Sequence, residues 1–538
     1  MPIYIISYNM VVEKEKSSND LRQNARNSKG VIMNCDFTIY DMIARNAVLY
    51  PERIALVNGG RRTTYGGFKQ QCDQCAGGLA AAGLAAGDRI AVLSGNCDDF
   101  MILYGAAAKI GVIVVPINTR LGEAEVTYAL QDTTPLCLIS AKEHREAAQR
   151  AAMRTASIQK HYAFGDDDVQ GDTFPFRSLL LEGGSDVSGT VSGDAPCLII
   201  HTAAVGGSPR GSVLTQTNLL TCGLQISHLL ELGNRDCYLG LLPLFHIGGI
   251  AMTLATIMTG GKTVLVERFD PSAVPGLIAG EKGTFFVTFP PMLTAILDAQ
   301  EKAALDLSIL RAGCGVDSPE TIERFLKANP QAAFYSLYGQ TEAMPVSGCN
   351  YRKRPGSIGN PAILTRVALF DDLDRAVPAE TPGEICVRSP AVFQGYWNLP
   401  EETAYAFRNG WHHTGDLGRI DADGFLWYAG RKPEKELIKP GGENVYPAEV
   451  EKVILEHSAI QEVCVIGVPD RQWGEAVKAV CVLKQGRLAS AEELIDFVAS
   501  RIARYKKPKH VLFVDDLPKT AGGAIDRELV KKAWGSES

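Results

Sequence analysis

The chain has 538 residues, of which 46% are hydrophobic and 21% are charged. This balance is typical of a soluble globular protein, and the length favours roughly three to four units of ordinary domain size. The formal net charge of −7 argues against a surface for nucleic acid or for an anionic membrane. No apolar run approaches the ~18 residues of a spanning helix, so we expect no stable membrane insertion.

Thirteen cysteines are scattered along the chain. An odd, scattered set predicts reduced thiols in the cytoplasm rather than a disulfide framework. Cys72 and Cys75 form a CxxC, but no second pair accompanies them and residues 68–84 have the composition of a helix. We therefore expect both thiols to pack in a core rather than to bind a metal or carry redox chemistry.

The chain opens with a polar, irregular stretch, which we expect to be an extension over residues 1–34. Its order of charged and apolar segments is not that of a secretory signal. We expect the globular part to start near Cys35. From Thr38 to about residue 140, helices alternate with short apolar strands, which predicts a mostly parallel sheet covered on both faces. Residues 166–194 are polar and glycine-rich and predict a surface connection. The strands predicted in this part are residues 54–57 and 62–65, which flank an Asn-Gly-Gly hairpin signal, and residues 89–93 and 112–116.

An apolar run at residues 197–200 leads into the stretch HTAAVGGSPRG at 201–211. With residues 213–220 after it, the pattern predicts a strand, a glycine-rich turn and a helix. Backbone N–H groups at such a turn suit an oxyanion, and Arg210 adds a charge that matches phosphate. The common nucleotide loop GxxxxGK(S/T) is excluded because Ser212 stands where its lysine belongs. A plain connection without a ligand remains an equal alternative for this stretch taken alone.

The alternation of strands and helices resumes beyond this stretch. Residues 367–387 change to shorter strands with Asp-Asp and Pro-Gly turns, which predicts an antiparallel or barrel unit. The charged residues 431–439 precede Pro-Gly-Gly and predict a hinge, after which the chain reads as a small α+β domain. Further strands are predicted at residues 238–246 (running into a loop), 262–266, 285–289, 310–312 and 333–337.

Three motifs follow predicted strands at the edge where doubly wound folds bind ligands. They are YGQTE at residues 338–342, HTGD at 413–416 and GR at 430–431. Together and in this order they resemble the motifs of the adenylate-forming superfamily, which includes acyl-CoA synthetases, luciferases and the adenylation domains of peptide synthetases. The resemblance covers nearly everything from Thr38 to Arg527 and points to the acyl-CoA ligase branch.

The resemblance implies an α/β fold in two domains. A large N-terminal domain, residues 35–433, would hold doubly wound mixed sheets and a small barrel. A hinge at residues 434–436 would carry a small, mobile α+β C-terminal domain at residues 437–538. A swing about this hinge would exchange one face of the active site for another.

In the YGQTE motif, the resemblance implies that Tyr338 stacks on adenine, with Gly339 beside it. Thr341 would meet the α-phosphate of ATP. Glu342 would hold Mg²⁺, a hard cation that prefers oxygen ligands. A solvated loop carboxylate is the structural alternative for Glu342.

Two further segments are implied to bind the nucleotide. Gly313, Cys314 and Gly315 would form a glycine-rich loop on the other face of adenine. Asp416 would accept hydrogen bonds from the ribose hydroxyls, which a carboxylate is suited to do, and Arg431 would also reach the ribose. An ordinary tight turn and a turn-capping aspartate are the alternatives.

Two segments match motifs on the thiol side of the family's site. LPLFH at residues 242–246 matches a motif whose histidine, His246, gates the entry of carboxylate and thiol. A lone histidine after an apolar strand is otherwise a core residue. GGENVYP at residues 441–447, which begins with Gly441 and Gly442, resembles the loop that lines the acceptor tunnel after the swing. A glycine turn without a ligand is the alternative.

The phosphate loop departs from the family pattern TSGTTGxPKG. Residues 203–206 replace its serine, glycine and two threonines, and Arg210 replaces its lysine. Thr202 keeps the one hydroxyl that remains. Backbone N–H groups, including those of Gly206 and Gly207, and Arg210 would have to hold the phosphates.

The second departure lies near the C-terminus, where the family has PKTxxGKIxR. The second lysine of that motif reaches the carboxylate and the α-phosphate, and Ala524 stands in its place here. Lys519, at the other basic position, is the candidate substitute. Three explanations stay open: an introduced replacement, another cation in the lysine's role, or a slow first half-reaction.

We therefore predict an ATP-dependent, AMP-forming carboxylic acid–CoA ligase with ATP, Mg²⁺ and coenzyme A as cofactors. Few charges lie near His246, residues 289–291 and Met344, which favours an apolar acid, fatty or aromatic. Ala524 motivates the alternative of a catalytically impaired or non-catalytic nucleotide- or acyl-binding relative. A luciferase-like oxygenase would use the same adenylate, but no residue favours it. We expect no nucleic-acid partner, and the sequence leaves open whether the chain forms a homodimer.

Overall fold

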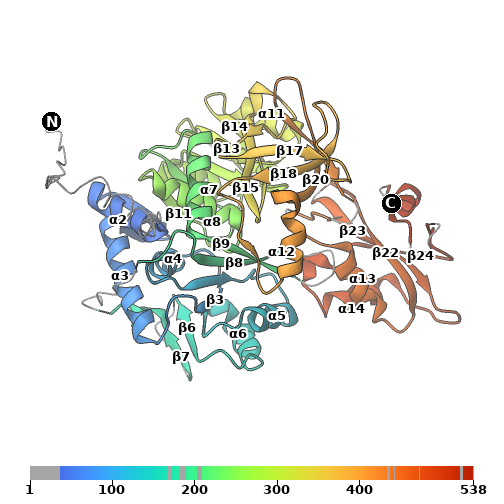
Figure 1. Ribbon diagram of the computed structural model, residues 1–538, viewed down its shortest axis with the longest axis horizontal. Helices are drawn as coiled ribbons and strands as arrows, with labels where there is room; N and C mark the ends of the chain where they lie inside the picture. Colours follow the sequence, from blue (N-terminus) through green and yellow to red (C-terminus); the bar gives the residue numbers. More distant parts are fainter. Residues whose placement is uncertain are drawn as a thin grey trace, which may run out of the picture.

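The computed structural model describes residues 37–165, 169, 171–181, 190–202, 209–303, 305–432, 437–441, 443–471, 473–520 and 525–536 (Figure 1). Several predictions lie outside the described residues. They are the N-terminal extension, Gly206 and Gly207 in the phosphate loop, the hinge at 434–436, Gly442 and Ala524.

Two large mixed sheets organise the N-terminal domain. The first runs in the order β16-β15-β14-β13-β12-β10-β11-β1-β2, and its strand pairs from β1 to β14 are parallel. Its strands are β16 (Asn360–Pro361), β15 (Ala343–Asn350), β14 (Ala333–Gln340), β13 (Ala312–Gly315), β12 (Phe285–Thr288), β10 (Cys237–Gly240), β11 (Lys262–Leu265), β1 (Ile54–Asn58) and β2 (Arg61–Thr64).

The second sheet runs in the order β19-β9-β8-β4-β3-β5-β6-β7, with parallel pairs from β8 to β7. Its strands are β19 (Gly395–Tyr396), β9 (Arg210–Thr215), β8 (Pro196–Thr202), β4 (Ile113–Pro116), β3 (Arg89–Leu93), β5 (Cys137–Ala141), β6 (Lys160–Phe164) and β7 (Thr173–Pro175).

Helices cover both sheets. The α-helices of this domain are α2 (Ile39–Leu49), α3 (Tyr65–Ala81), α4 (Asp98–Ile110), α5 (Glu123–Thr133), α6 (Arg145–Ala152), α7 (Gln216–Leu229), α8 (Ile247–Met258), α9 (Val274–Glu281), α10 (Met292–Lys302), α11 (Pro319–Ala328) and α12 (Pro400–Ala406). Short 3₁₀ helices are η1 (Lys142–His144), η2 (Phe176–Leu179), η3 (Tyr351–Lys353) and η4 (Arg408–Gly410).

Helices α2, α3, α4 and α8 contribute to a core that both sheets share. One apolar cluster contains Leu56 of β1 and Ile90 of β3, together with Phe68, Phe100 and Ile250 from three helices. All five side chains are fully buried. Burial of a side chain of this size contributes roughly 1.5–3 kcal/mol, so the shared core holds the two sheets in one arrangement.

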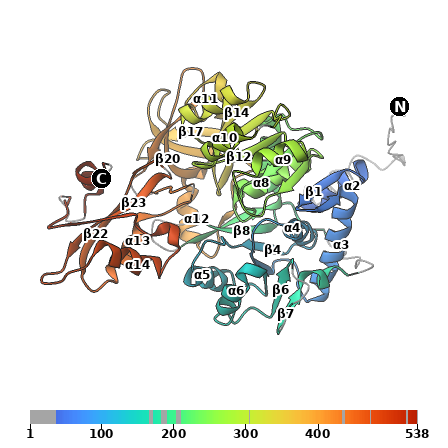
Figure 2. The same cartoon turned by 180° about the vertical axis from the view of Figure 1, so that it is seen from behind.

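Two smaller sheets complete the chain. The third is antiparallel, with the order β17 (Arg366–Phe370), β18 (Gly383–Arg388), β20 (His412–Ile420) and β21 (Leu426–Arg431). The C-terminal domain contains β22 (Ile460–Asp470), β23 (Gly474–Leu483) and β24 (His510–Val514), with α13 (Pro447–Leu455), α14 (Ala491–Ala499), α15 (Arg527–Trp534) and η6 (Arg504–Lys506). It lies at the opposite end of the molecule from α2 and α3 in both views (Figures 1 and 2).

Several local predictions are confirmed. The hairpin around residues 58–60 is the antiparallel pair β1–β2, and the strand predicted at 89–93 is β3. Cys72 and Cys75 lie in α3 with fully buried side chains, and burial raises the pKa of both thiols. Packing is therefore their role, because a thiol held protonated in an apolar core is a poor metal ligand and nucleophile.

The helix predicted over residues 213–220 is wrong at its start. Residues up to Thr215 form β9, which pairs antiparallel with β8, and α7 begins at Gln216. Thr215 and Asn218 form a capping box, and this fixes the first residue of the helix. Residues 203–208 therefore join two antiparallel strands and do not lead into a helix N-terminus.

Three other expectations need correction. The motif at 313–315 is part of strand β13 and not a loop. The connection over 166–194 contains β7 and η2, and Phe176 and Leu179 of η2 are buried. The unit at residues 367–387, expected to be antiparallel or a barrel, belongs to an antiparallel sheet. Among the described strands, β17 and β21 are the two edges of this sheet and do not pair with each other, so it does not close into a barrel.

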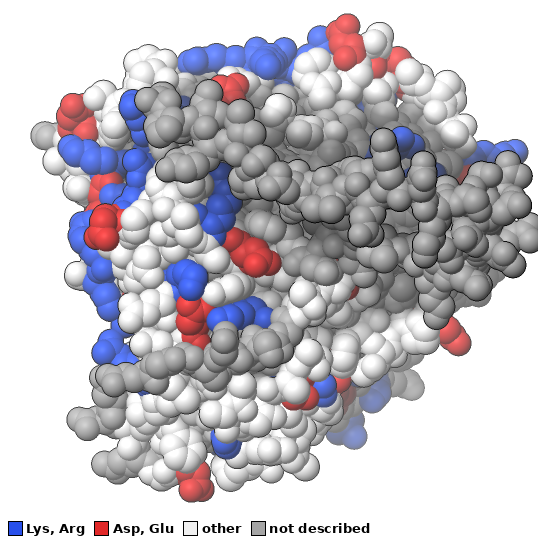
Figure 3. All heavy atoms as spheres, turned by 60° about the vertical axis from the view of Figure 1, so that its left-hand side comes forward, with Lys and Arg blue, Asp and Glu red and all other residues white. Residues whose placement is uncertain are grey.

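Charged groups are mixed on the surface near α2 and α3. Where Figure 3 shows described residues on this face, Lys and Arg side chains lie beside Asp and Glu side chains. Over the described part of the chain, every helix is too short or too polar to cross a bilayer.

The close approach of α3 to η2 generates a stability prediction. A Cβ on Gly78 would lie 2.0 Å from the carbonyl oxygen of Leu179, whereas a Cβ on Gly280 in α9 would meet nothing within 4 Å. We expect Gly78→Ala to destabilise the fold by about 1–3 kcal/mol, because the backbones must separate. Gly280→Ala should be neutral or stabilising by up to about 1 kcal/mol. Thermal melting of both variants checks this, and equal shifts in melting temperature would contradict it.

Candidate active site

Tyr338, Asp416 and Arg431 meet where three strands of two sheets come together. The Tyr338 hydroxyl, on β14, donates a 2.7 Å hydrogen bond to Oδ2 of Asp416 on β20. Arg431 on β21 is the cross-strand partner of Asp416, and its Nε lies 3.1 Å from Oδ1. The structure thus brings together an aromatic ring, a carboxylate and a guanidinium, which is a suitable set for a nucleoside.

A buried carboxylate holds the part of β20 that carries Asp416. Glu384 Oε1 on β18 accepts a 2.9 Å hydrogen bond from the backbone N–H of Gly415. Gly415 has φ +69°, a left-handed conformation that favours glycine. The Thr414 hydroxyl donates to the carbonyl of Ile385 and accepts from the Asp416 N–H. These bonds explain why the HTGD motif needs its threonine and glycine.

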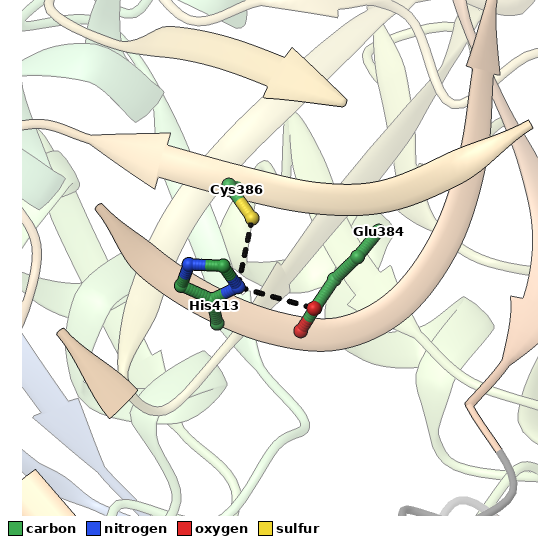
Figure 4. A group of neighbouring side chains, drawn as sticks. All are labelled: Glu384, Cys386 and His413. Carbon is green, nitrogen blue, oxygen red and sulfur yellow. Dashed lines mark hydrogen bonds and ion pairs between the residues drawn. The ribbon is translucent and has the colours of Figure 1, made fainter. Parts of the chain in front are cut away.

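Glu384 also belongs to a polar cluster with Cys386 and His413 (Figure 4). His413 Nδ1 lies 3.1 Å from Glu384 Oε2 and 3.2 Å from Cys386 Sγ. Arg408 and Lys432 donate to the same Oε2 at 3.0 and 3.3 Å. Burial opposes the charge of Glu384, but His413 and Lys432 outweigh it and lower its pKa to about 2. Two cationic side chains already neutralise this carboxylate, so the cluster is a structural support and a poor site for a metal cation.

A second group of polar side chains surrounds Glu342, which is 6% exposed. Its Oε1 accepts hydrogen bonds from the hydroxyls of Thr202 at 3.1 Å, Tyr396 at 3.2 Å and Ser212 at 3.3 Å. The guanidinium of Arg210 lies 4.3 Å from the centre of the Tyr396 ring, in a cation–π contact. Oxygen atoms and one positive charge therefore gather at the ends of β8 and β9.

Strand geometry explains this grouping. Thr202 faces Arg210 across the β8–β9 pair, and Ser212 is two residues further along β9. Side chains of paired residues, and of residues two apart, lie on the same face of a sheet. The sequence analysis did not single out Ser212 and Tyr396. Ser212 could have been found from its position two residues after Arg210 on a strand, which places both side chains on one face.

The oxygen atoms of Glu342 and its hydroxyl neighbours fit a magnesium ion. The three hydroxyl bonds go to one oxygen of the carboxylate and leave Oε2 outside them. Mg²⁺ typically binds one or two carboxylates together with substrate phosphates and water, and it prefers oxygen ligands. A single buried carboxylate with hydroxyl neighbours meets these requirements.

Gly339 and Thr341 lie on the same β14–β15 hairpin as Tyr338 and Glu342. A Cβ on Gly339 would lie 2.9 Å from the carbonyl oxygen of Ala343, so the tight turn requires glycine. Gln340 pairs with Ala343 and leaves Thr341 and Glu342 as the two residues of the turn. The hairpin therefore joins the two groups of polar side chains.

The predicted glycine-rich segment packs next to this hairpin, because β13 pairs with β14. A Cβ on Gly315 would lie 2.0 Å from the carbonyl oxygen of Thr288, and one on Gly313 would lie 3.0 Å from Phe325. Cys314 is fully buried, and burial raises the pKa of its thiol to about 12. Close packing accounts for both glycines, and the Cys314 side chain belongs to the core.

His246 meets the C-terminal domain through Glu443. Glu443 Oε1 lies 2.7 Å from Arg120 Nη1 and 3.7 Å from His246 Nε2, and Oε2 accepts from Asn118 Nδ2 at 3.2 Å. Burial opposes the charge of Glu443, but His246 and Arg120 outweigh it and lower the pKa. The loop that contains Gly441 thus reaches the N-terminal domain beside His246.

Gly441 holds this loop against the turn between β22 and β23. Its N–H donates to the carbonyl of Trp473, and its φ is +60°. A Cβ there would lie 2.7 Å from the Trp473 ring.

Lys519 lies away from the groups around Asp416 and Glu342. Its Nζ is 2.9 Å from Glu462 and 3.8 Å from Asp516, within the C-terminal domain, and its side chain is 40% exposed.

The family model for AMP-binding enzymes matches residues 43–397, and the model for their C-terminal domain matches residues 449–524. The chain belongs to the AMP-binding enzyme family. Feruloyl-CoA synthase from Amycolatopsis sp is 35% identical over 499 residues, which cover 91% of this chain and 98% of that protein. Long-chain-fatty-acid–CoA ligase from Bacillus subtilis (strain 168) is 33% identical over 530 residues, with 91% and 93% covered.

Solved structures agree with this assignment. One is o-succinylbenzoate CoA synthetase from Bacillus subtilis, a double mutant bound with its product analogue. It matches with a TM-score of 0.80 at 28% identity and covers 91% of this chain and 97% of that one. The family member described here therefore lies in the acyl-CoA ligase branch of the adenylate-forming superfamily.

The buried Glu384 predicts a pH dependence of stability. Its pKa is about 2 when folded and 4.5 ordinarily, so its contribution is fully present above pH 4.5 and is lost as the pH falls towards 2. This difference corresponds to at most about 3 kcal/mol. We expect Glu384→Gln to lower the free energy of unfolding at pH 7 and the gap to the parent chain to narrow between pH 4.5 and 2.

Urea unfolding at several pH values measures this gap. The control is Glu380→Gln, which alters an exposed carboxylate that pairs with Arg419. A gap for Glu384→Gln that stays constant down to pH 2.5 would contradict the assigned pKa.

Proposed function

We propose that this enzyme is an ATP-dependent acid–CoA ligase that forms an acyl-adenylate and then a thioester. The observation that carries the proposal is the β14–β15 hairpin. Tyr338, at one end, contacts the Asp416–Arg431 pair, and Glu342, at the turn, contacts Thr202 and Ser212. One hairpin thus carries Tyr338, from the set suited to a nucleoside, and Glu342, from the set suited to phosphate and a metal ion. Together the two sets suit a nucleoside triphosphate. We call the Tyr338, Asp416 and Arg431 set the nucleoside group.

The chemistry explains why such an enzyme needs both groups. A free carboxylate is a poor electrophile because its leaving group would be oxide. When its oxygen attacks the α-phosphorus of ATP, the bond to pyrophosphate breaks and an acyl-adenylate forms. The sulfur of coenzyme A then attacks the acyl carbon, AMP leaves and the thiol proton is released. Alignment of reactants and stabilisation of phosphate charge supply the rate enhancement.

In this proposal, Tyr338 and Gly339 contact adenine, and Asp416 and Arg431 contact the ribose. Arg210, Thr202 and Thr341 contact phosphate, with the backbone of Gly206 and Gly207 in the loop outside the described residues. Ser212 is fully buried and Glu342 is 6% exposed, which supports a phosphate site that holds little water and in which each charge interaction is stronger than in water. For Gly313, Cys314 and Gly315, we propose that the backbone of β13, and not the Cys314 side chain, borders adenine.

Glu342 is the proposed metal ligand, with neighbouring hydroxyls and substrate phosphates completing the oxygen shell. Bound Mg²⁺ would neutralise charge on the triphosphate. Glu342 itself holds its position through three hydroxyl donors, so its second oxygen is oriented before substrate binds.

On the thiol side, His246 borders the entry of acid and thiol, with Gly441 and Gly442 in the loop beside it. The contact between His246 and Glu443 supports an orientation of the C-terminal domain suited to the thioester step. Lys519 and Ala524 would then approach the site only in the other orientation, after a swing about residues 434–436. The exposure of Lys519 is compatible with such movement.

The proposed acid is apolar, fatty or aromatic. Phe289 and Met344 pack in one apolar cluster with Leu242, close in sequence to His246. The relatives are named feruloyl-CoA synthase and long-chain-fatty-acid–CoA ligase, so aromatic and fatty acids both belong in a substrate panel. The non-catalytic alternative receives no support from relatives that are named as ligases and synthases.

We also propose a reducing compartment, the cytoplasm, for this protein. Twelve cysteines lie among the described residues, eleven of them are buried, and no disulfide joins any two of these twelve. Sedimentation can test whether the chain forms a homodimer, which the sequence leaves open.

Acid-dependent release of pyrophosphate tests the proposed function. With Mg·ATP, coenzyme A and a panel of fatty, aryl and dicarboxylic acids, we expect release with apolar acids and none above background with malonate. Ala524→Lys should raise the adenylation rate if the missing lysine limits it, and Lys519→Ala should lower the rate if Lys519 substitutes. If both the parent chain and Ala524→Lys bind ATP but release no pyrophosphate with any acid, the proposal is contradicted and the non-catalytic alternative is favoured.

Asp416→Asn tests the nucleoside group. The amide keeps one acceptor oxygen in place of two and loses the negative charge, so it cannot accept from the Tyr338 hydroxyl, Arg431 and the ribose hydroxyls as the carboxylate does, and the KM for ATP should rise about tenfold or more. The matched control is Asp423→Asn, which alters an exposed aspartate of the β20–β21 turn that pairs with Arg354. Steady-state kinetics at varied ATP measure this, and equal KM values for the two variants would contradict the assignment.

A further inference from the structure

Glu125 on α5 accepts three hydrogen bonds, two of which connect the two domains. Its Oε2 accepts from the backbone N–H of Gly122 at 2.7 Å and from that of Ala503 at 2.9 Å. Its Oε1 accepts from Nζ of Lys506 at 2.5 Å. The first bond caps its own helix, and the other two reach the C-terminal domain, so one carboxylate serves both domains.

Lys506 is shared between two carboxylates. Its Nζ also lies 2.6 Å from Oε1 of Glu449 on α13, within the C-terminal domain. Lys506 is 2% exposed, and both carboxylate side chains are 9% exposed. Burial opposes the charge on Lys506, but Glu449 and Glu125 outweigh it and raise its pKa, so the ammonium form is the stable one. A buried, charged triad of this kind depends on all three members.

The triad lies at the surface where the domains meet. In both ribbon views α5 lies beside α13 and α14 (Figures 1 and 2). Backbone also approaches backbone here, because a Cβ on Gly122 would lie 3.8 Å from the carbonyl carbon of Ile502. Asn118 and Arg120, which hold Glu443 beside His246, belong to the same stretch between β4 and α5. The C-terminal domain therefore contacts the N-terminal domain at two nearby places, the stretch between β4 and α5 and the first turn of α5.

We propose that Glu125 is a positioning residue for the thioester step: its ion pair with Lys506 holds the C-terminal domain in the orientation that places Glu443 beside His246. This inference rests on the proposed function for its catalytic consequence, but its structural part, a fixed orientation of the domains, does not. Glu125 itself touches no substrate.

The division of the triad suits a contact that must also open. When the domains separate, Lys506 keeps Glu449, which belongs to the same domain, and Glu125 keeps the N–H of Gly122. Neither side is left with a buried, unpaired charge, since both become exposed to water. The contact can therefore be strong in the closed arrangement without blocking its release.

Glu125→Gln tests the proposal, with Glu123→Gln as the matched control. Glu123 lies in the same first turn of α5 but pairs with Arg150 and Arg154 inside the N-terminal domain. We expect Glu125→Gln to slow thioester formation from preformed acyl-adenylate about tenfold or more, because one member of a buried ion pair is lost. Acid-dependent ATP–pyrophosphate exchange should stay within about twofold, and Glu123→Gln should match the parent chain in both assays.

Lys506→Met and the double variant complete a thermodynamic cycle. If the two residues act through their contact, the double variant should be no slower in the thioester step than the slower single variant. Additive losses, an unchanged thioester rate in Glu125→Gln, or a parallel fall in both half-reactions would overturn the proposal.

Small-angle X-ray scattering separates this proposal from the proposed function. Glu125→Gln should change the scattering profile, which reports the relative placement of the domains, whereas Glu123→Gln should not. If the parent chain forms no acyl-adenylate with any acid, the proposed function fails, and the scattering comparison alone decides the role of Glu125. Identical profiles for all three proteins would then overturn it.

Discussion

The carboxylate of Glu342 is the point on which the arrangement of the site depends. It lies on the hairpin between β14 and β15 of the first large sheet, and its three hydroxyl donors belong to strands of the second. The Glu342 carbonyl also accepts from the N–H of Phe393, just before β19. One residue therefore ties the two sheets together at the edge where ligands bind in such folds, and a change in its ionisation or position would affect both.

Much of this architecture could be predicted from the sequence because the information is local. The YGQTE, HTGD and GR motifs lie on the hairpin and strands that bring Tyr338, Asp416 and Arg431 together, and the turn signal at residues 58–60 was sufficient for the first hairpin. The phosphate-loop region was mispredicted where local pattern and tertiary pairing compete. Residues 213–215 continue a helical run in sequence, but their pairing with β8 makes them a strand.

What could not be predicted are contacts between residues far apart in the chain. Glu384, Glu443 and Lys506 are ordinary charged residues in the sequence, and only the fold brings them to His413, Arg120 and Glu125. Buried ionisable groups of this kind are expensive unless they are fully paired. Their partners come from other strands or from the other domain, so no spacing pattern in the sequence predicts these contacts.

The stretch at residues 203–208 lies between two strands that are held in place by contacts outside it. It is framed by the pair Thr202 and Arg210, which the ladder between β8 and β9 holds in register, and by the cluster around Glu342 beneath them. All the residues of this frame lie outside 203–208. Substitutions within that stretch therefore leave the paired strands and the buried Glu342 cluster in place, so its sequence can vary at little cost to the fold.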